Sequence, residues 1–117
     1  MKRTIGVLLL ALVPSLGAAG DGFADGADLL DWMKALERVE GDPGDSQAVA
    51  KAARVMGYVM AVADMNQGTM LCVPPGVGAK QLIAIVHKFL HKSPEVWNLR
   101  ASGLVVIALR PTFPCKR

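Results

Sequence analysis

The side chains best suited to metal chemistry in this chain are two histidines. His87 and His91 are four residues apart, so on a helix they share a face and could together bind zinc or copper. The motif of a zinc hydrolase also needs a glutamate beside the first histidine, but that position is Lys88. Lys88 and Lys92 would also repel a cation. We therefore interpret the histidines as the polar flank of a helix, and we predict no metal site and no cofactor.

Methionine offers a second route to metal binding, because its thioether is a soft ligand for Cu(I). Met56 and Met60 are spaced to share a helix face. The same predicted face carries Val49 and Ala63, which favours a role for both methionines as gap-filling core side chains.

The remaining chemistry-bearing residues do not form a catalytic pattern. Asp28 and Asp31 form a pair of carboxylates at helical spacing on the first predicted helix, and we predict that they face solvent. No serine lies in a nucleophile elbow, and the sequence places Ser46, Ser93 and Ser102 at helix starts. A binding or structural role is therefore favoured over an enzyme.

Residues 1–20 have the layout of a secretory signal peptide. Lys2 and Arg3 precede an apolar run over residues 5–13, and small residues then permit cleavage after Ala19 or Gly20. The apolar run is too short to cross a membrane, which takes about 20 residues. We expect the segment to be removed and the remaining chain, residues 21–117, to reside in the periplasm as one domain.

Export determines the state of the two cysteines, Cys72 and Cys115. In an oxidising compartment an even cysteine count indicates a disulfide, whereas the alternative is a pair of buried free thiols. A bond across 43 positions would contribute about 4 kcal/mol in the chain-entropy model. We predict that Cys72 and Cys115 are paired.

Charge is divided unevenly along the exported chain. Without Lys2 and Arg3, eleven basic residues stand against ten acidic ones. Residues 21–45 hold eight acids and two bases, whereas residues 46–117 hold nine bases and two acids. The two halves either pack together and neutralise each other or present an acidic first helix to a basic partner. One tyrosine and no basic stripe argue against nucleic-acid binding.

Hydrophobic spacing is helical along most of the chain and predicts a small all-α domain of four helices. We expect the helices near residues 26–39, 45–66, 78–92 and 101–109, with a short turn before Trp97. Asp25 or Asp28 can cap the first helix, and Asp45 or Ser46 the second.

The second helix is rich in small residues. Gly57 lies in its interior, where glycine costs up to about 1 kcal/mol, so we expect a packing reason for it. The small residues also make this helix a candidate dimer surface. Its predicted inner face consists of Val49, Ala52, Ala53, Met56, Val59, Met60 and Ala63.

Several segments together resemble one protein family. They are Asp28-Leu29-Leu30-Asp31-Trp32, Gly57-Tyr58-Val59-Met60-Ala61-Val62-Ala63-Asp64, Leu71-Cys72-Val73-Pro74-Pro75-Gly76-Val77, Gln81-Leu82, Ser93-Pro94-Glu95-Val96-Trp97, Ala101-Ser102-Gly103-Leu104-Val105 and Phe113-Pro114-Cys115. Between about Gly26 and Cys115 the chain is similar to the Rap/Tai immunity proteins of type VI secretion. The resemblance implies a helical periplasmic protein, commonly a homodimer, that binds and blocks a secreted peptidoglycan amidase.

The chain departs from the pattern of this family at a few positions. Many relatives carry cysteines where Met33 and Val55 stand, and the resemblance implies that packing of these two side chains replaces a staple between the first two helices. Pro111 is a further departure, which we expect to end the last helix near Leu109.

Two loops are candidates for contact with the effector. One consists of Asn66, Gln67, Gly68 and Thr69, next to Met70, and we expect the adjacent disulfide to hold it. The other spans residues 92–100 and carries Trp97 and Arg100, residue types enriched at binding hot spots. The competing interpretation of Trp97 is a side chain that plugs the core.

A second function class is a small periplasmic chaperone or stress protein with a single disulfide. The eight acids of residues 21–45 would lose their pairing with the basic half at low pH and release apolar surface. Metal binding through the histidines and methionines is a third and weaker hypothesis.

Overall fold

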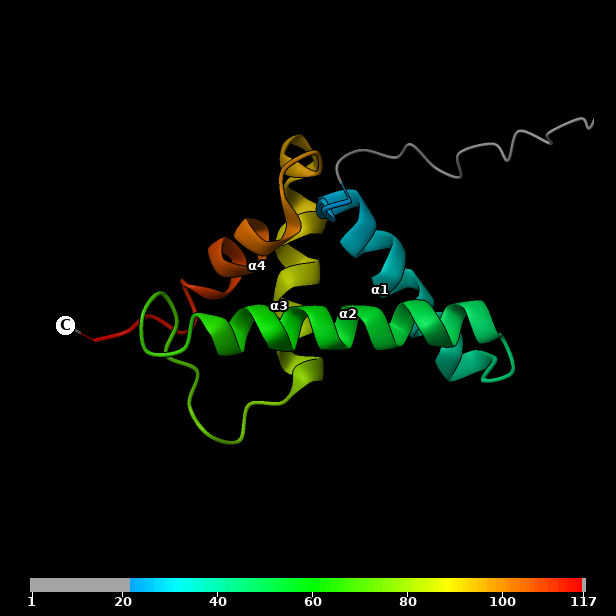
Figure 1. Ribbon diagram of the computed structural model, residues 1–117, viewed down its shortest axis with the longest axis horizontal. Helices are drawn as coiled ribbons and strands as arrows, with labels where there is room; N and C mark the ends of the chain where they lie inside the picture. The colour runs from blue at the N-terminus through cyan, green and yellow to red at the C-terminus, as the bar shows by residue number, and fades with distance from the viewer. Residues whose placement is uncertain (1–21, 117) are drawn as a thin grey trace, which may run out of the picture.

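The computed structural model describes residues 22–116. These residues form four α-helices and one 3₁₀ turn, as the hydrophobic spacing predicts (Figure 1). The predicted signal peptide lies outside the described residues. Within those residues, no helix is long and apolar enough to cross a membrane.

Helix α1 spans Gly26–Gly41 and begins with a reciprocal cap. The Asp28 backbone N–H donates to the Asp25 carboxylate at 2.9 Å, and the Asp25 N–H donates to the Asp28 carboxylate at 3.0 Å. Both acids that could have capped the helix therefore do so together. Helix α1 ends two residues beyond the predicted position.

Helix α2 spans Ser46–Met65, and the Asp45 carboxylate caps it by accepting from the Ala48 N–H at 3.1 Å. Figure 1 shows α2 crossing in front of α3, with α1 over one half of α2 and α4 near the other. The α1–α2 contact is the most extensive between any two helices of the described chain. At the α1–α2 contact, the Trp32 and Tyr58 rings meet edge to face, with their ring centres 5.9 Å apart.

The prediction of which α2 residues face the core is partly wrong. The buried residues of α2 are Ala48, Ala52, Val55, Val59 and Ala63, whereas the predicted core residues Val49, Ala53 and Met60 are exposed. Because α2 carries apolar residues on most of its circumference, two neighbouring stripes have the right periodicity, and periodicity alone does not choose between them. The stripe with Val55 and Val59 is the one that faces the core.

Helix α3 spans Ala79–Lys92, and helix α4 spans Ala101–Leu109 after the 3₁₀ turn η1 at Pro94–Val96. The β-branched run of α4 is helical, and the helix ends at Leu109, two residues before Pro111, as predicted. The core contains no buried polar or charged side chain among the described residues. Its fully buried members include Leu29, Val55, Val59, Leu71, Leu82, Val86, Leu90, Val105 and Leu109.

Candidate functional site

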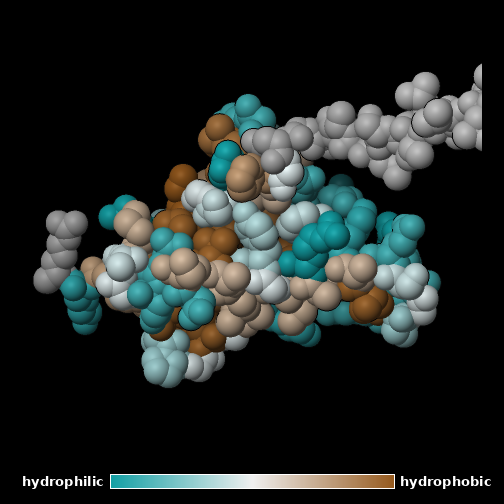
Figure 2. Space-filling model, viewed as in Figure 1, coloured by the Kyte–Doolittle hydropathy of each residue, from teal (hydrophilic) through white to brown (hydrophobic). Residues whose placement is uncertain are grey.

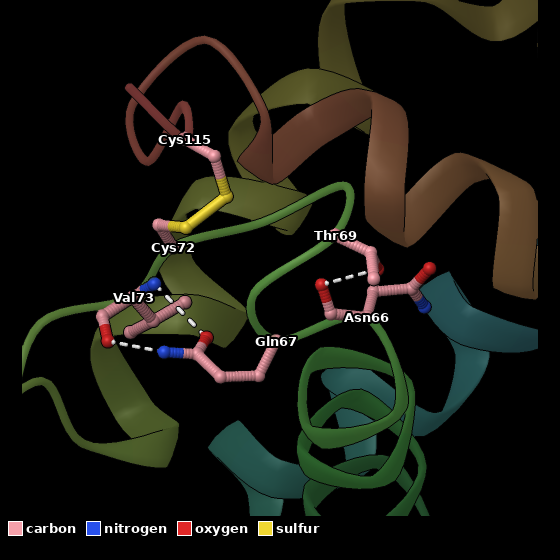
Figure 3. Close-up of a disulfide and its surroundings, with 6 residues drawn as sticks. All are labelled: Asn66, Gln67, Thr69, Cys72, Val73 and Cys115. Carbon is pink, nitrogen blue, oxygen red and sulfur yellow. Dashed lines mark hydrogen bonds between the residues drawn. A yellow bond between two sulfur atoms is a disulfide. The ribbon is translucent and has the colours of Figure 1, made fainter. Parts of the chain in front are cut away.

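The disulfide between Cys72 and Cys115 is formed, with a Cα–Cα distance of 4.8 Å (Figure 3). The Cys72 N–H also donates to the Phe113 carbonyl at 2.9 Å, and the Phe113 side chain is buried. One covalent bond, one backbone hydrogen bond and one core side chain therefore hold the C-terminal tail against the segment that precedes α3. The predicted pairing is confirmed.

The first candidate loop, residues 66–71, is shaped mainly by its own hydrogen bonds. The Asn66 carbonyl accepts from the backbone N–H groups of Thr69, Met70 and Leu71 at 3.0–3.2 Å and from the Thr69 hydroxyl at 3.0 Å. Gly68 has φ +80°, a conformation that other residues rarely adopt. Leu71 is fully buried and anchors the end of the loop. The disulfide is therefore a neighbour of this loop and not its main support.

Gln67 connects the loop to the disulfide segment. Its side-chain amide donates to the Val73 carbonyl at 2.9 Å, and its side-chain oxygen accepts from the Val73 N–H at 3.0 Å (Figure 3). The Gln67 side chain therefore bonds to the Val73 backbone in the way that a neighbouring β-strand would, and it holds the residue that follows Cys72 in place. The composition of the loop gave no sign of this contact, because it depends on the path of residues 72–75 in space.

The second candidate loop is fastened to the start of α1. The Trp97 indole N–H donates to the Leu90 carbonyl at 2.7 Å, and the half-buried ring packs against the core. The Trp97 carbonyl accepts from the Ala27 N–H at 3.0 Å. These contacts favour the interpretation of Trp97 as a plug over that of an exposed anchor.

Arg100 and two apolar side chains form an exposed surface next to this loop. The Arg100 guanidinium lies 4.1 Å from the centre of the Phe23 ring, an arrangement that a cation–π interaction stabilises. Phe23 is 62% exposed and Leu99 is 48% exposed. We name Phe23, Leu99 and Arg100 the apical patch. The sequence indicated Leu99 only as part of the loop at residues 92–100, and it did not indicate Phe23, because nothing local places Phe23 beside Arg100.

The backbone beneath the apical patch is held by pairing of two distant segments. The Gly26 N–H donates to the Leu99 carbonyl at 3.1 Å, and the Ala101 N–H donates to the Ala24 carbonyl at 2.9 Å. Asp25 and Arg100 form an isolated antiparallel bridge between these bonds. The C-terminal end of the loop before α4 is therefore held in place by the segment that precedes α1.

The two candidate loops do not form one site. Figure 1 shows residues 66–71 beyond the C-terminal end of α2, whereas the loop before α4 lies beside the start of α1. Asn66, Gln67, Gly68 and Thr69 thus belong to one surface, and Trp97 and Arg100 belong to another.

The histidines line a groove between α1 and α3. His87 and His91 have ring centres 6.0 Å apart and border a hollow of about 520 Å³ together with Leu30, Trp97 and neighbouring charged residues. No group of three or more His, Cys, Asp or Glu side chains that could hold a metal ion occurs in residues 22–116. We assign no ligand to this groove.

Comparison with protein families identifies the chain. The family model described as Rap1a immunity proteins matches residues 25–115, which include every helix of the structure. The chain belongs to the Rap1a immunity protein family. Comparison with curated proteins finds no match.

Membership of the Rap1a family implies that the chain binds a partner, an effector protein, and members of such families are generally not enzymes. The two departures from the usual cysteine pattern fit this fold. Met33 on α1 is 3% exposed and Val55 on α2 is fully buried, and both belong to the hydrophobic core. Apolar side chains therefore occupy the two positions at which the family resemblance led us to expect cysteines.

Proposed function

We propose that this Rap1a-family chain is a periplasmic immunity protein that binds and occludes a peptidoglycan amidase delivered by type VI secretion. The family match over residues 25–115 is the observation that carries the proposal. The predicted signal peptide and the single disulfide support a periplasmic location, since disulfides persist in oxidising compartments. Occlusion needs a stiff surface rather than catalytic groups, because preorganisation lowers the entropy cost of binding.

The apical patch is the first surface that we propose for contact with the effector. An exposed phenylalanine, a leucine and an arginine lie together on a backbone fastened by hydrogen bonds from both sides. Aromatic residues and arginine dominate many binding hot spots. Trp97 supports this surface from below through its bond to Leu90.

The loop at residues 66–69 is the second proposed contact surface. Gln67, Gly68 and Thr69 are exposed, and they are flanked by Met65 at 82% and Met70 at 41% exposure. The internal hydrogen bonds of Asn66 give this loop a defined shape before any partner arrives. Since the two surfaces are far apart on the molecule, variants can separate their contributions.

We also propose that the chain forms a homodimer through the outer face of α2. This face, which we define as Val49, Ala50, Ala53, Gly57 and Ala61, is exposed and apolar, and it forms the pale to tan band across the front of Figure 2. A Cβ atom built on Gly57 meets no atom within 4 Å, so packing inside one chain does not explain this glycine. Close approach of a second α2 helix would explain it.

A protection assay tests the proposed role. The hydrolase encoded by the adjacent gene is directed to the periplasm of a laboratory bacterium, with and without this chain. We expect lysis by the hydrolase alone and survival when the full chain is present. A chain lacking residues 1–20 is the control for location and should not protect. Lysis at the same rate with the full chain would contradict the proposal.

Two sets of variants then assign the contact surface. Arg100→Glu and Leu99→Asp change the apical patch, and Met65→Glu and Met70→Glu change the other end of the molecule. These side chains are exposed, so folding should be preserved, which circular dichroism can check. Loss of protection by one set and not by the other identifies the surface that binds. Protection by both sets would rule out both surfaces.

No observation in residues 22–116 favours the chaperone hypothesis over the family role, so we do not retain it as a second function. Two of the acids of α1 form ion pairs with lysines of other helices. Asp31 pairs with Lys51 at 2.7 Å, and Glu40 pairs with Lys80 at 3.8 Å. These contacts join α1 to α2 and α3, as the first interpretation of the charge asymmetry predicted.

A further inference from the structure

The Cys-Val-Pro-Pro-Gly-Val segment forms more than the start of the disulfide. Residues 73–77 make one wall of a hollow of about 330 Å³, and the C-terminal part of α2 makes the opposite wall. Leu82 of α3 is also part of the lining. Most of the lining side chains are apolar: Met60, Ala63, Val73, Pro74, Pro75, Val77 and Leu82.

The wall of the hollow is fixed before any ligand arrives. Both backbone polar groups of Val73 are bonded to the Gln67 side chain, at 2.9 and 3.0 Å. Cys72, the preceding residue, is held by the disulfide, and Gly76 turns the chain with φ +91°. The Gln67 side chain gives one donor and one acceptor to Val73, so it supports this wall of the hollow.

Asp64 is the one ionisable residue that lines the hollow. It is exposed, and within residues 22–116 the structure gives its carboxylate no ion pair and no hydrogen-bond donor. Residues 46–117 contain one other acid, Glu95, among nine basic residues. An unpaired anion beside an apolar, preformed hollow is complementary to a ligand with an aliphatic stem and a cationic end.

We propose that this hollow, the Asp64 hollow, receives a lysine or arginine side chain of a protein partner. The methylene stem lies against Val73, Pro74 and Val77, and the charged end reaches Asp64 at the rim. Long basic side chains commonly bury their stems in this way while the head stays near water. The inference rests on the proposed function, because it takes the effector to be the protein that supplies the basic side chain.

A small probe tests the Asp64 hollow without the effector. N-acetyl-lysine methylamide is titrated into isotope-labelled protein, with the norleucine analogue as the uncharged control. We expect saturable shifts at the Val73, Val77 and Leu82 methyl groups, with a Kd on the order of 1–10 mM for so small a ligand. Norleucine should bind several-fold more weakly. Equal response to both probes, or no saturable shift at these methyls, would overturn the inference.

Asp64→Asn provides the matching variant, with Glu95→Gln as its control. Each substitution removes one negative charge from residues 46–117, but only Asp64 lines the hollow. Asp64→Asn should weaken lysine binding about 3- to 5-fold, as expected for the loss of a partly exposed ion pair. Glu95→Gln should leave it unchanged. Identical Kd values for Asp64→Asn and the wild type would contradict the role of Asp64.

Asp64→Asn is then measured against the hydrolase encoded by the adjacent gene. It is expected to weaken the complex roughly tenfold, because the ion pair is desolvated in a protein interface. If the wild type binds the hydrolase and Asp64→Asn binds it equally well, the inference fails and the proposed function stands. If the wild type does not bind, the proposed function fails, and so does the assignment of the effector as the source of the basic side chain. Dimer dissociation by Asp64→Asn in sedimentation would instead identify a second copy as the source and would likewise overturn that assignment.

Discussion

Gly26 lies where helix α1 closely approaches the loop before α4. A Cβ atom at this position would lie 2.9 Å from the Trp97 Cα atom and 2.9 Å from the Leu104 Cδ1 atom. The first neighbour is backbone and cannot move aside alone. The close approach allows the Gly26 N–H to reach the Leu99 carbonyl, so the apical patch depends on this glycine.

Gly26→Ala should destabilise the protein by about 1–3 kcal/mol, because the added methyl group overpacks a buried contact. Gly41→Ala is the matched control, since Gly41 lies at the other end of the same helix, where an added Cβ atom would meet no atom within 4 Å. Urea unfolding followed by circular dichroism measures both. Equal stability of the two variants would show that Gly26 is not crowded.

Two kinds of side-chain contact differ in how far the sequence predicts them: the helix caps and the contact between Gln67 and Val73. The roles of Asp25, Asp28 and Asp45 as caps follow from local chemistry, and the structure confirms them. Gln67 makes its two bonds to Val73, six positions away, through a turn whose path no local pattern defines. Local sequence patterns therefore predict the helix caps but not the pair of hydrogen bonds between Gln67 and Val73.

Gln67→Leu should destabilise the protein by about 1–2 kcal/mol, since Val73 loses a donor and an acceptor that water replaces only in part. Gln81→Leu on the exposed surface of α3 is the control and should have little effect. Hydrogen exchange at the Val73 amide gives the local measurement. An unchanged exchange rate of the Val73 amide in Gln67→Leu would show that the Gln67 side chain does not hold Val73.

At the scale of elements, α2 is the helix whose orientation the sequence left open. Its apolar residues fill two adjacent stripes, and the choice of the Val55 and Val59 stripe depends on packing against the rest of the core. Val49 and Met60 are consequently exposed, at 42% and 41%. The existence and approximate bounds of all four helices, in contrast, followed from periodicity and turn residues.

Gly57→Ala tests whether the outer face of α2 is an interface. With open space around the added methyl group, alanine should stabilise the isolated monomer by up to about 1 kcal/mol. If a second α2 packs there, the same methyl group should weaken the dimer. Gly103→Ala on α4 is the matched control, because Gly103 also lies in a helix with open space around it.

Sedimentation equilibrium and thermal unfolding across a range of protein concentrations distinguish these effects. The outer-face dimer predicts weaker self-association for Gly57→Ala and unchanged association for Gly103→Ala. A monomeric wild type, or two variants that associate alike, would refute the proposed dimer surface.

For the whole molecule, the disulfide links the tail to the segment between α2 and α3. The cross-link spans 43 positions, and Phe113 inserts into the core beside it. The pairing of the two cysteines was predictable from the signal peptide and the even cysteine count. The wall that residues 73–77 add to the Asp64 hollow was not predictable, because the hollow forms only where these residues, α2 and α3 meet in space.

Replacement of both cysteines by alanine should lower the free energy of unfolding by about 4 kcal/mol in the chain-entropy model. Within a total of roughly 5–15 kcal/mol, this loss is large. Urea unfolding of the oxidised, reduced and substituted proteins provides the measurement. The loop at residues 66–71 should keep its amide protection in the native state of each form, since its bonds are internal. A change in stability below about 1 kcal/mol would contradict the structural role of the cross-link.

We propose that this Rap1a-family chain blocks an effector by binding it. The inhibition is measured as the release of cleavage products from purified peptidoglycan by the hydrolase of the adjacent gene, titrated with residues 21–117 of this chain. We expect a linear loss of hydrolase activity that ends at an equimolar ratio. Full activity at saturating excess of the chain would contradict it.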